Sequence, residues 1–138
     1  IEEVLADLEP LAQEKEIKLV EESEELVMTG SDILIYRMIY NLVENAIKYN
    51  HVGGQVLVKA AQKDTDIVIE IEDTGNGISE EFRERVFEPF FRVDKSRSRA
   101  LGGVGLGLAM VREIVRVHDG KISIKENEYG GTTFEVVL

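Results

Sequence analysis

The sequence predicts an α/β fold, a two-layer sandwich in which one mixed β-sheet is covered on one face by helices. Apolar residues recur with helical spacing in some stretches, whereas apolar and polar residues alternate in others, as strands require. Along the chain the order is helix, strand, helix, two strands, irregular segment, helix, two strands. Because 138 residues is the size of an ordinary domain, we expect a single domain over residues 1–138.

The N-terminal half begins with a predicted helix at residues 1–14. Pro10 lies inside this helix, so we expect it to be kinked or short. A strand is predicted at 17–21. Ser31 then gives an N-cap signal for a long amphipathic helix that we expect to end near Asn50.

Alternating segments predict the remaining strands. Residues 55–61 and 66–73 follow a Gly-Gly turn and look like a pair of neighbouring strands. Residues 121–125 and 132–138 close the chain as two further strands. Together with the strand in the N-terminal half, these segments predict a sheet of about five strands.

The stretch from residue 75 to 105 has no regular pattern, apart from one short helix predicted at 79–86 with Ser79 as its cap. Loops of this length inside a compact domain are uncommon and are often functional lids. A second long helix is predicted at 105–118.

The charge of the chain limits its partners. The net charge is −11, which argues against binding to nucleic acid or to a membrane surface. No cysteine is present, so a disulfide or thiolate metal site is excluded, and no apolar tract is long enough to cross a bilayer. Four of the eight residues at 92–99 (RVDKSRSR) are basic, which indicates either a solvated loop or a local anion site.

The long helix contains the segment NLVENAIKYN at 41–50, in which polar residues border the apolar face. Asn41, Asn45 and Lys48 fall within about 60° of one another on a helical wheel, Tyr49 lies just beside them, and Glu44 is expected to point away. Amide oxygens are ligands for Mg²⁺ and an ammonium neutralises phosphate, so this edge suits a metal–phosphate group. The alternative is that both amides cap neighbouring backbone groups. The apolar face is predicted to consist of Ile35, Met38, Ile39, Leu42, Ala46 and Ile47.

Three segments are rich in glycine. DTGNGI at 73–78 follows a strand and is either a strand-end turn or a place where backbone approaches a ligand. GGVGLGL at 102–108 precedes a helix and is a flexible hinge, a phosphate seat, or both. It fits neither a P-loop nor the G-x-G-x-x-G pattern. GGTTF at 130–134 opens the last strand and is an ordinary turn when taken alone.

These segments, with FEPFFRVDKSRSR between them, resemble in order and spacing the N, G1, F, G2 and G3 boxes of the ATP-binding domain of sensor histidine kinases. The resemblance covers residues 41–134. It implies a left-handed-crossover α/β sandwich, shared with gyrase-type, heat-shock-chaperone and mismatch-repair ATPases. The sheet is then mostly antiparallel, about three helices cover it, and a mobile lid spans about residues 79–104. The implied ligand is ATP with Mg²⁺.

The resemblance also implies a role for each matching residue in base binding. The carboxylate of Asp73 receives the exocyclic amine of adenine, which selects adenine over guanine. Thr132, rather than Thr133, supports this contact through a water molecule, and the ring of Tyr49 packs near the base. The nucleotide pocket further includes Gly75, Gly77 and Ile78.

Phosphate and metal binding are implied at the other boxes. Asn45 ligates Mg²⁺, and Asn41 and Lys48 face the phosphates. Arg92, with Lys95 and Arg97, brings positive charge onto the γ-phosphate. The backbone that wraps the triphosphate is that of Gly103, Gly105, Leu106 and Gly107. Phe87, Phe90 and Phe91 either pack the lid against the body or a neighbouring domain, or form an ordinary satellite core.

The identity of residue 41 indicates the reaction. In gyrase-type ATPases a general-base glutamate stands one turn before the metal-binding asparagine, but here Asn41 occupies that place and an amide cannot accept a proton. Hydrolysis is therefore disfavoured, and transfer to a histidine is favoured. The chain's histidines, His51 and His118, are expected to be structural, with a protonated His118 suiting the end of its helix.

The phosphoacceptor histidine is accordingly expected upstream of residue 1, in a separate dimerisation domain. The chain is predicted to be the excised catalytic domain of a protein-histidine kinase, monomeric in isolation and homodimeric in the full-length protein. Its partners are that dimerisation domain and, indirectly, a response regulator, in the cytoplasm and without direct membrane contact. Two alternatives remain: a nucleotide-binding switch without transfer, and a serine kinase of the anti-sigma-factor type.

Overall fold

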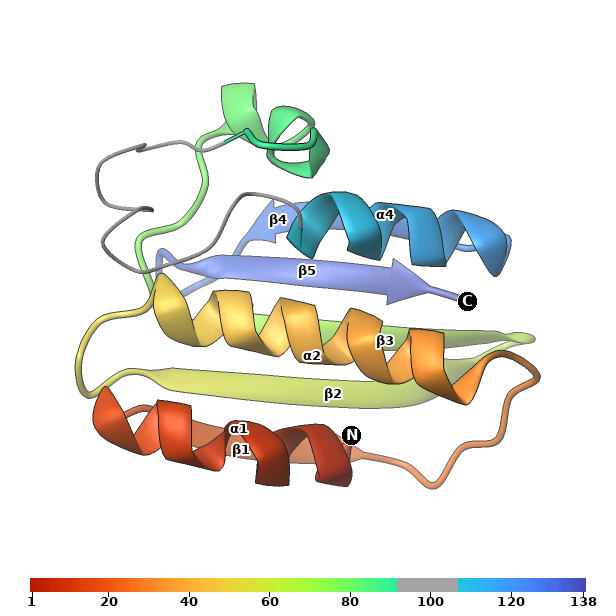
Figure 1. Ribbon diagram of the computed structural model, residues 1–138, viewed down its shortest axis with the longest axis horizontal. Helices are drawn as coiled ribbons and strands as arrows, with labels where there is room; N and C mark the ends of the chain where they lie inside the picture. The colour runs from red at the N-terminus through yellow and green to blue at the C-terminus, as the bar shows by residue number, and fades with distance from the viewer. Residues whose placement is uncertain (92–106) are drawn as a thin grey trace.

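The computed structural model describes residues 1–91 and 107–138 and contains a five-stranded mixed sheet (Figure 1). The strand order is β1-β2-β3-β5-β4. β1 pairs with β2 in parallel, whereas every other pair is antiparallel. The predicted mixed, mostly antiparallel sheet is therefore confirmed. The strands are β1 Lys18–Ser23, β2 Gln55–Lys63, β3 Asp66–Asp73, β4 Lys121–Glu126 and β5 Thr132–Val137.

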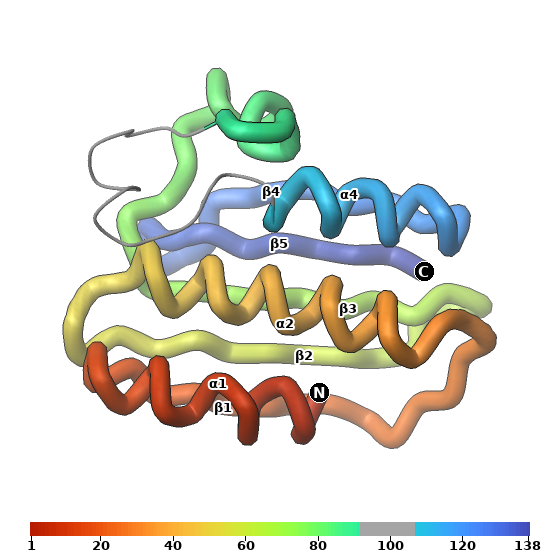
Figure 2. Tube along the Cα trace, viewed as in Figure 1, coloured from red at the N-terminus to blue at the C-terminus, as the bar shows by residue number. Residues whose placement is uncertain are grey.

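The α-helices of the described chain lie side by side on one face of the sheet (Figures 1 and 2). They are α1 Glu2–Glu14, α2 Asp32–Lys48 and α4 Gly107–Val117. α2 lies between the other two helices and contacts both. The polar edge of α2 is partly exposed, and Asn41 on it lies against α4.

The connection from β1 through α2 to β2 is left-handed (Figure 1). β1 and β2 run in the same direction and are neighbours in the sheet, and α2 crosses in front of the sheet between them. Crossovers between parallel strands are right-handed in about 98% of cases, so this hand is diagnostic. It agrees with the left-handed-crossover sandwich expected from the sequence boxes.

Of the two outcomes expected from Pro10, a short helix does not occur, because α1 runs through the proline for 13 residues to Glu14. Val4, Leu8 and Ala12 are at most 1% exposed, so core contacts hold the helix on both sides of the proline. Proline at position 10 has no N–H to donate to the carbonyl of Ala6, and Ala6 is exposed, so this carbonyl is accessible to solvent.

One short helix was predicted at residues 79–86, but the chain forms two 3₁₀ turns, η1 Glu80–Phe82 and η2 Arg85–Phe87. Ser79 makes no side-chain cap bond; instead its carbonyl accepts from the backbone N–H of Phe82. Val86 and Phe87 are both buried. Burial of two consecutive side chains fixes this segment more strongly than local helix propensity does.

The core lies between the helix layer and the sheet. α2 contributes Met38, Ile39, Leu42, Val43, Ala46 and Ile47, which are all nearly or fully buried. Five of the six predicted apolar positions are thus in the core, whereas Ile35 is only partly buried and Val43 was not predicted. No helix of the described ranges is long and apolar enough to cross a bilayer.

Replacing Ser31 with alanine is expected to lower the free energy of unfolding by about 1 kcal/mol, the usual contribution of an N-cap. The hydroxyl oxygen of Ser31 accepts a hydrogen bond from the backbone N–H of Leu34 at 3.3 Å, and alanine removes this acceptor. Urea denaturation with an unchanged m-value measures the effect. An unchanged midpoint would show that solvent caps the helix as well as the hydroxyl does.

Candidate functional site

The candidate site lies where β3 ends, beside the start of β5 and the C-terminal end of α2. Asp73, the last residue of β3, is only 7% exposed. Its Oδ1 accepts hydrogen bonds from the backbone N–H of Gly75 at 2.9 Å and of Thr132 at 3.1 Å. Within the described ranges, its Oδ2 has no hydrogen-bond partner. The carboxylate is thus fixed through one oxygen and can receive a donor at the other.

Burial raises the pKa of Asp73 above its ordinary value. The two backbone N–H donors and the nearby His51 lower this pKa, but they do not offset the loss of hydration. A buried carboxylate with one oxygen unpaired gains from a ligand that donates a hydrogen bond. Such a donor would also favour the ionised form.

Glycines allow the backbone segments around Asp73 to approach one another. A Cβ atom on Gly131 would lie 2.1 Å from the backbone oxygen of Asp73, and one on Gly75 would lie 2.5 Å from the backbone oxygen of Tyr49. Gly77 has φ +74° and a Cβ there would lie 2.8 Å from the backbone oxygen of Gly130. Larger residues therefore cannot replace these three without moving backbone.

The two asparagines of α2 differ in their contacts. The side-chain amide of Asn41 donates to the backbone oxygen of Arg37 at 2.7 Å, as the capping alternative predicted. The side-chain amide of Asn45 makes no hydrogen bond to another described residue, although it is only partly exposed. Of the two alternatives, the capping one applies to Asn41, and Asn45 remains available to a ligand.

Lys48 pairs with Glu44 at 3.5 Å, and the side chains are 26% and 28% exposed. Glu44 was expected to point away from Lys48, and this expectation was wrong. The two residues are four apart, so they share a helix face, and the lysine side chain is long enough to reach back one turn. To bind an anion at this site, the ammonium of Lys48 must either break its ion pair with Glu44 or contact both anions at once.

The start of α4 lies against the polar edge of α2. A Cβ atom on Gly107 would lie 3.0 Å from Oδ1 of Asn41, so glycine allows close contact between the two helices. Free backbone N–H groups at a helix start attract anions. Gly107, the last member of the predicted phosphate-wrapping set, is thus brought beside Asn41.

Six of the residues predicted to contact phosphate lie outside the described ranges. They are Arg92, Lys95, Arg97, Gly103, Gly105 and Leu106. Ile78 lies at the beginning of the segment after β3 and is partly buried against the core. Tyr49 is 37% exposed at the C-terminal cap of α2, and its backbone contacts Gly75.

The backbone N–H of Thr132 donates directly to Asp73, and the expected water-mediated support of the adenine contact by Thr132 stays a prediction. The direct bond forms because Gly131 lets the two strands approach so closely. Thr133 is buried as well, and its hydroxyl accepts a bond from Asn127 rather than contacting the carboxylate. The identity of the side chain at position 132 is therefore not what orients Asp73.

The phenylalanines of the F box divide between the two alternatives. Phe87 is 4% exposed and packs edge-on against Phe134, with ring centroids 6.3 Å apart, so it belongs to the core. Phe91 packs against Phe82, and Arg85 lies 4.6 Å from the centroid of the Phe91 ring. Phe90 is 69% exposed and has φ +65°, an unusual conformation for a residue with a side chain.

Two asparagines near the site were missed by sequence reasoning, Asn50 and Asn127. Asn50 is 1% exposed; its amide oxygen accepts from the hydroxyl of Thr74 at 3.1 Å and its amide nitrogen donates to the backbone oxygen of Gln55 at 3.0 Å. It joins the end of α2 to the ends of β2 and β3. Both asparagines precede turns, and asparagine beside a turn is the signal that could have indicated them.

The expected structural roles of the histidines agree with their contacts. Nε2 of His118 accepts a hydrogen bond from the backbone N–H of Ser31 at 3.2 Å, and Nδ1 lies 2.8 Å from the backbone oxygen of Ile114. His51 is exposed and adjoins Asn50.

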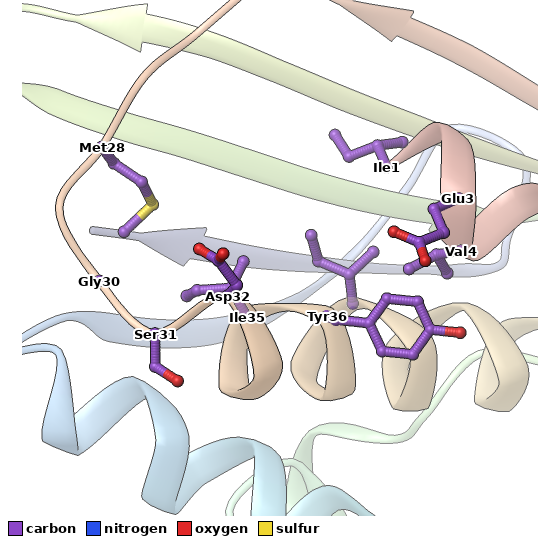
Figure 3. Close-up of a pocket in the computed structure, with 10 residues that line it drawn as sticks. Ile1, Glu3, Val4, Met28, Gly30, Ser31, Asp32, Ile35 and Tyr36 are labelled. Carbon is purple, nitrogen blue, oxygen red and sulfur yellow. The ribbon is translucent and has the colours of Figure 1, made fainter.

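A pocket of about 210 Å³ lies at the other end of α2, between its first turns and the start of α1 (Figure 3). Its lining includes Met28, Tyr36 and the carboxylates of Glu3 and Asp32 (Figure 3). Small-molecule sites usually measure about 300–1,000 Å³. This pocket is smaller, it is acidic, and it contains none of the predicted site residues.

Comparison with known proteins identifies the family of the chain. The model of the family described as "Histidine kinase-, DNA gyrase B-, and HSP90-like ATPase" matches residues 30–138. The chain belongs to this family. The match includes the described site residues on α2, β3, α4 and β5.

Sensor histidine kinases are among the proteins to which the chain is similar. The chain is 43% identical over 113 residues to the sensor-like histidine kinase SenX3 of Mycobacterium tuberculosis, a match that covers 82% of the chain and 28% of SenX3. The structure of the mycobacterial sensor histidine kinase MprB is similar, with a TM-score of 0.84 and 30% identity over 99% of the chain and 91% of MprB. Full-length ShkA in complex with AMPPNP gives a TM-score of 0.83 and 26% identity over 99% of the chain and 28% of ShkA. The chain thus spans less than a third of the curated relative that it matches.

Proposed function

We propose that this ATPase-family domain binds ATP with Mg²⁺ and transfers the γ-phosphate to a histidine of a dimerisation domain. The observation that carries the proposal is Asp73, whose buried carboxylate is fixed through Oδ1 by two backbone donors and keeps Oδ2 open. The relatives are sensor histidine kinases, and ShkA has been solved with an ATP analogue.

The open oxygen of Asp73 suits adenine. The exocyclic amine of adenine donates a hydrogen bond, whereas guanine has a carbonyl oxygen at that position, which a carboxylate repels. Selection by this oxygen is strong, because a ligand that covers it without donating a hydrogen bond removes its hydration and leaves it without a partner. Tyr49, beside Gly75 at the end of α2, supplies an aromatic ring at the edge of this region.

The residues present fit a magnesium ion shared with phosphate. The free amide of Asn45 offers one hard oxygen, and among residues 1–91 and 107–138 no cluster of three or more acidic or histidine side chains could hold a metal without the nucleotide. When bound, Mg²⁺ neutralises charge on the transferring phosphoryl group. Lys48 and the N–H groups at the start of α4 would hold the phosphates in line with the acceptor.

Asn41 favours phosphotransfer over hydrolysis. Its amide donates to the backbone of Arg37 and cannot remove a proton from water. A neutral imidazole acceptor needs no such base, because its nitrogen already carries a lone pair. Arg92 would add positive charge to the γ-phosphate from the proposed lid at 79–104. We further propose that the full-length protein carries the dimerisation domain, forms a homodimer and places this ATPase domain in the cytoplasm. A response regulator would be its indirect partner.

Radiolabelled ATP tests this function and separates it from its two alternatives. The chain is mixed with Mg²⁺, γ-labelled ATP and an added dimerisation domain that carries the phosphoacceptor histidine, and the label on that domain is followed with time. We expect transfer to a phosphohistidine that is labile in acid and stable in base. Acid-stable label would indicate a serine kinase, whereas ATP binding by calorimetry without any transfer would indicate a nucleotide switch.

A further inference from the structure

We propose that Asn127 is a positioning residue for Asp73, and that it maintains the discrimination between adenine and guanine. Asn127 follows the end of β4 and begins the turn into β5. It lies 54 positions from Asp73 in the sequence but contacts its backbone. The inference rests on the proposed nucleotide site, and it concerns a residue that does not itself face the ligand.

The amide oxygen of Asn127 organises the β4–β5 turn. It accepts hydrogen bonds from the backbone N–H groups of Tyr129 at 3.0 Å and Gly131 at 3.1 Å. The backbone N–H of Asn127 also donates to the backbone oxygen of Gly131 at 3.2 Å. Gly131 is therefore held through both its N–H and its carbonyl group, immediately before Thr132.

The amide nitrogen of Asn127 reaches the neighbouring strand. It donates to the backbone oxygen of Asp73 at 2.8 Å and lies 3.4 Å from the hydroxyl of Thr133. The β3–β5 ladder ends at the pair Glu72 and Thr133, so Asp73 lies one residue beyond it. Asn127 thus supplies a donor to the Asp73 carbonyl where the sheet no longer does.

One side chain consequently holds both partners of the bond that orients the carboxylate. Asn127 fixes the backbone of Asp73 on β3 and the backbone of Gly131 just before β5, and the next residue, Thr132, donates to Oδ1 of Asp73. Without these bonds the Thr132 N–H can move away from Oδ1. The carboxyl group would then rotate, and its open oxygen would no longer have a fixed position.

The hairpin itself does not depend on this side chain. Paired residues of β4 and β5 extend from Lys121–Val137 to Glu126–Thr132, and the backbone N–H of Gly130 donates to the backbone oxygen of Asn127. These backbone bonds remain in an alanine variant. The side chain adds two further things, the bonds of its oxygen within the turn and the link from the turn to β3.

Calorimetric titration with ATP and with GTP, both with Mg²⁺, tests the role of Asn127. For Asn127→Ala we expect ATP affinity to fall about tenfold and GTP affinity to change less than about twofold, so the ATP/GTP ratio falls about tenfold. Ser31→Ala is the control, because it destabilises the fold at the far end of α2 and should leave the ratio unchanged. An unchanged ratio in Asn127→Ala, or equal losses for both nucleotides, would refute the positioning role.

A second variant and a second measurement make the outcome decisive. Asn127→Asp keeps the oxygen that organises the turn and replaces the donor to β3 with a carboxylate oxygen that repels the Asp73 carbonyl, so it should lose discrimination even if the alanine variant does not fold. In Asn127→Ala without nucleotide, the pKa of Asp73, followed by carboxyl NMR, should rise further because the Thr132 N–H lowers it. An unchanged pKa would contradict the inference. Failure of the unaltered chain to bind ATP would instead refute the proposed function together with this inference.

Discussion

Replacing Asp73 with asparagine is expected to weaken ATP binding at least about tenfold, or by about 1.4 kcal/mol. Asparagine retains one oxygen, which can still accept from the backbone N–H groups of Gly75 and Thr132. Its NH₂ group then replaces Oδ2 and faces the adenine amine, so two donors oppose each other. Calorimetric titration with ATP measures the loss, and unchanged affinity would remove the adenine assignment.

The same substitution should not destabilise the fold at neutral pH. Burial raises the pKa of Asp73, so the folded state binds its proton more tightly than the unfolded state does. The free energy of unfolding of the parent therefore falls as pH rises from the ordinary pKa through the raised one. Asparagine does not titrate, so the variant does not lose this stability as the pH rises. The free energy of unfolding of the variant minus that of the parent should therefore be larger at pH 7 than below about pH 3.

Asp66→Asn is a matched control for the binding measurement. Asp66 begins the same strand, at the opposite end of β3, and it is exposed. Its substitution should leave ATP affinity unchanged. A loss of affinity equal to that of Asp73→Asn would show that net charge, rather than the position of the carboxylate, governs binding.

The strands and the long helix could be predicted from sequence because burial on one face imposes a period on the chain. β3 was predicted at its observed bounds, since its apolar and polar residues alternate from Asp66 to Asp73. Pro10 and the segment around Phe87 were mispredicted for one common reason. Packing against the core outweighs the local preference of a proline or a helix cap.

The candidate site could be predicted only in part. Asp73 and Asn45 were indicated by motifs, but the partners that position them lie far along the chain, and no periodicity reveals such contacts. Asn127 is an example, since its bond to Asp73 depends on where two strands stop pairing. The backbone N–H of Thr132 is another, because every residue except proline has this donor and the sequence does not mark it.

Asn45→Ala is expected to reduce Mg²⁺-dependent phosphotransfer by at least about 100-fold, the effect of losing a group that organises charge in the transition state. The amide of Asn45 has no partner among the described residues, so its removal breaks no hydrogen bond of the fold. Unfolding free energy should therefore change by less than about 0.5 kcal/mol. Rapid-quench measurement of transfer, paired with urea denaturation, separates a ligand-binding role from a structural one.

Asn45→Asp is the informative partner of the alanine variant. Aspartate keeps a hard oxygen at the same position, so it should retain part of the Mg²⁺-dependent transfer that alanine loses. Nucleotide binding measured in EDTA should change little in either variant, because Asp73, and not Asn45, contacts the base in the proposed complex. Full transfer by Asn45→Ala would place the metal on other residues. A large loss of stability would show that Asn45 supports the fold. The difference in hydrogen bonding between Asn41 and Asn45 would then no longer indicate a functional role for Asn45.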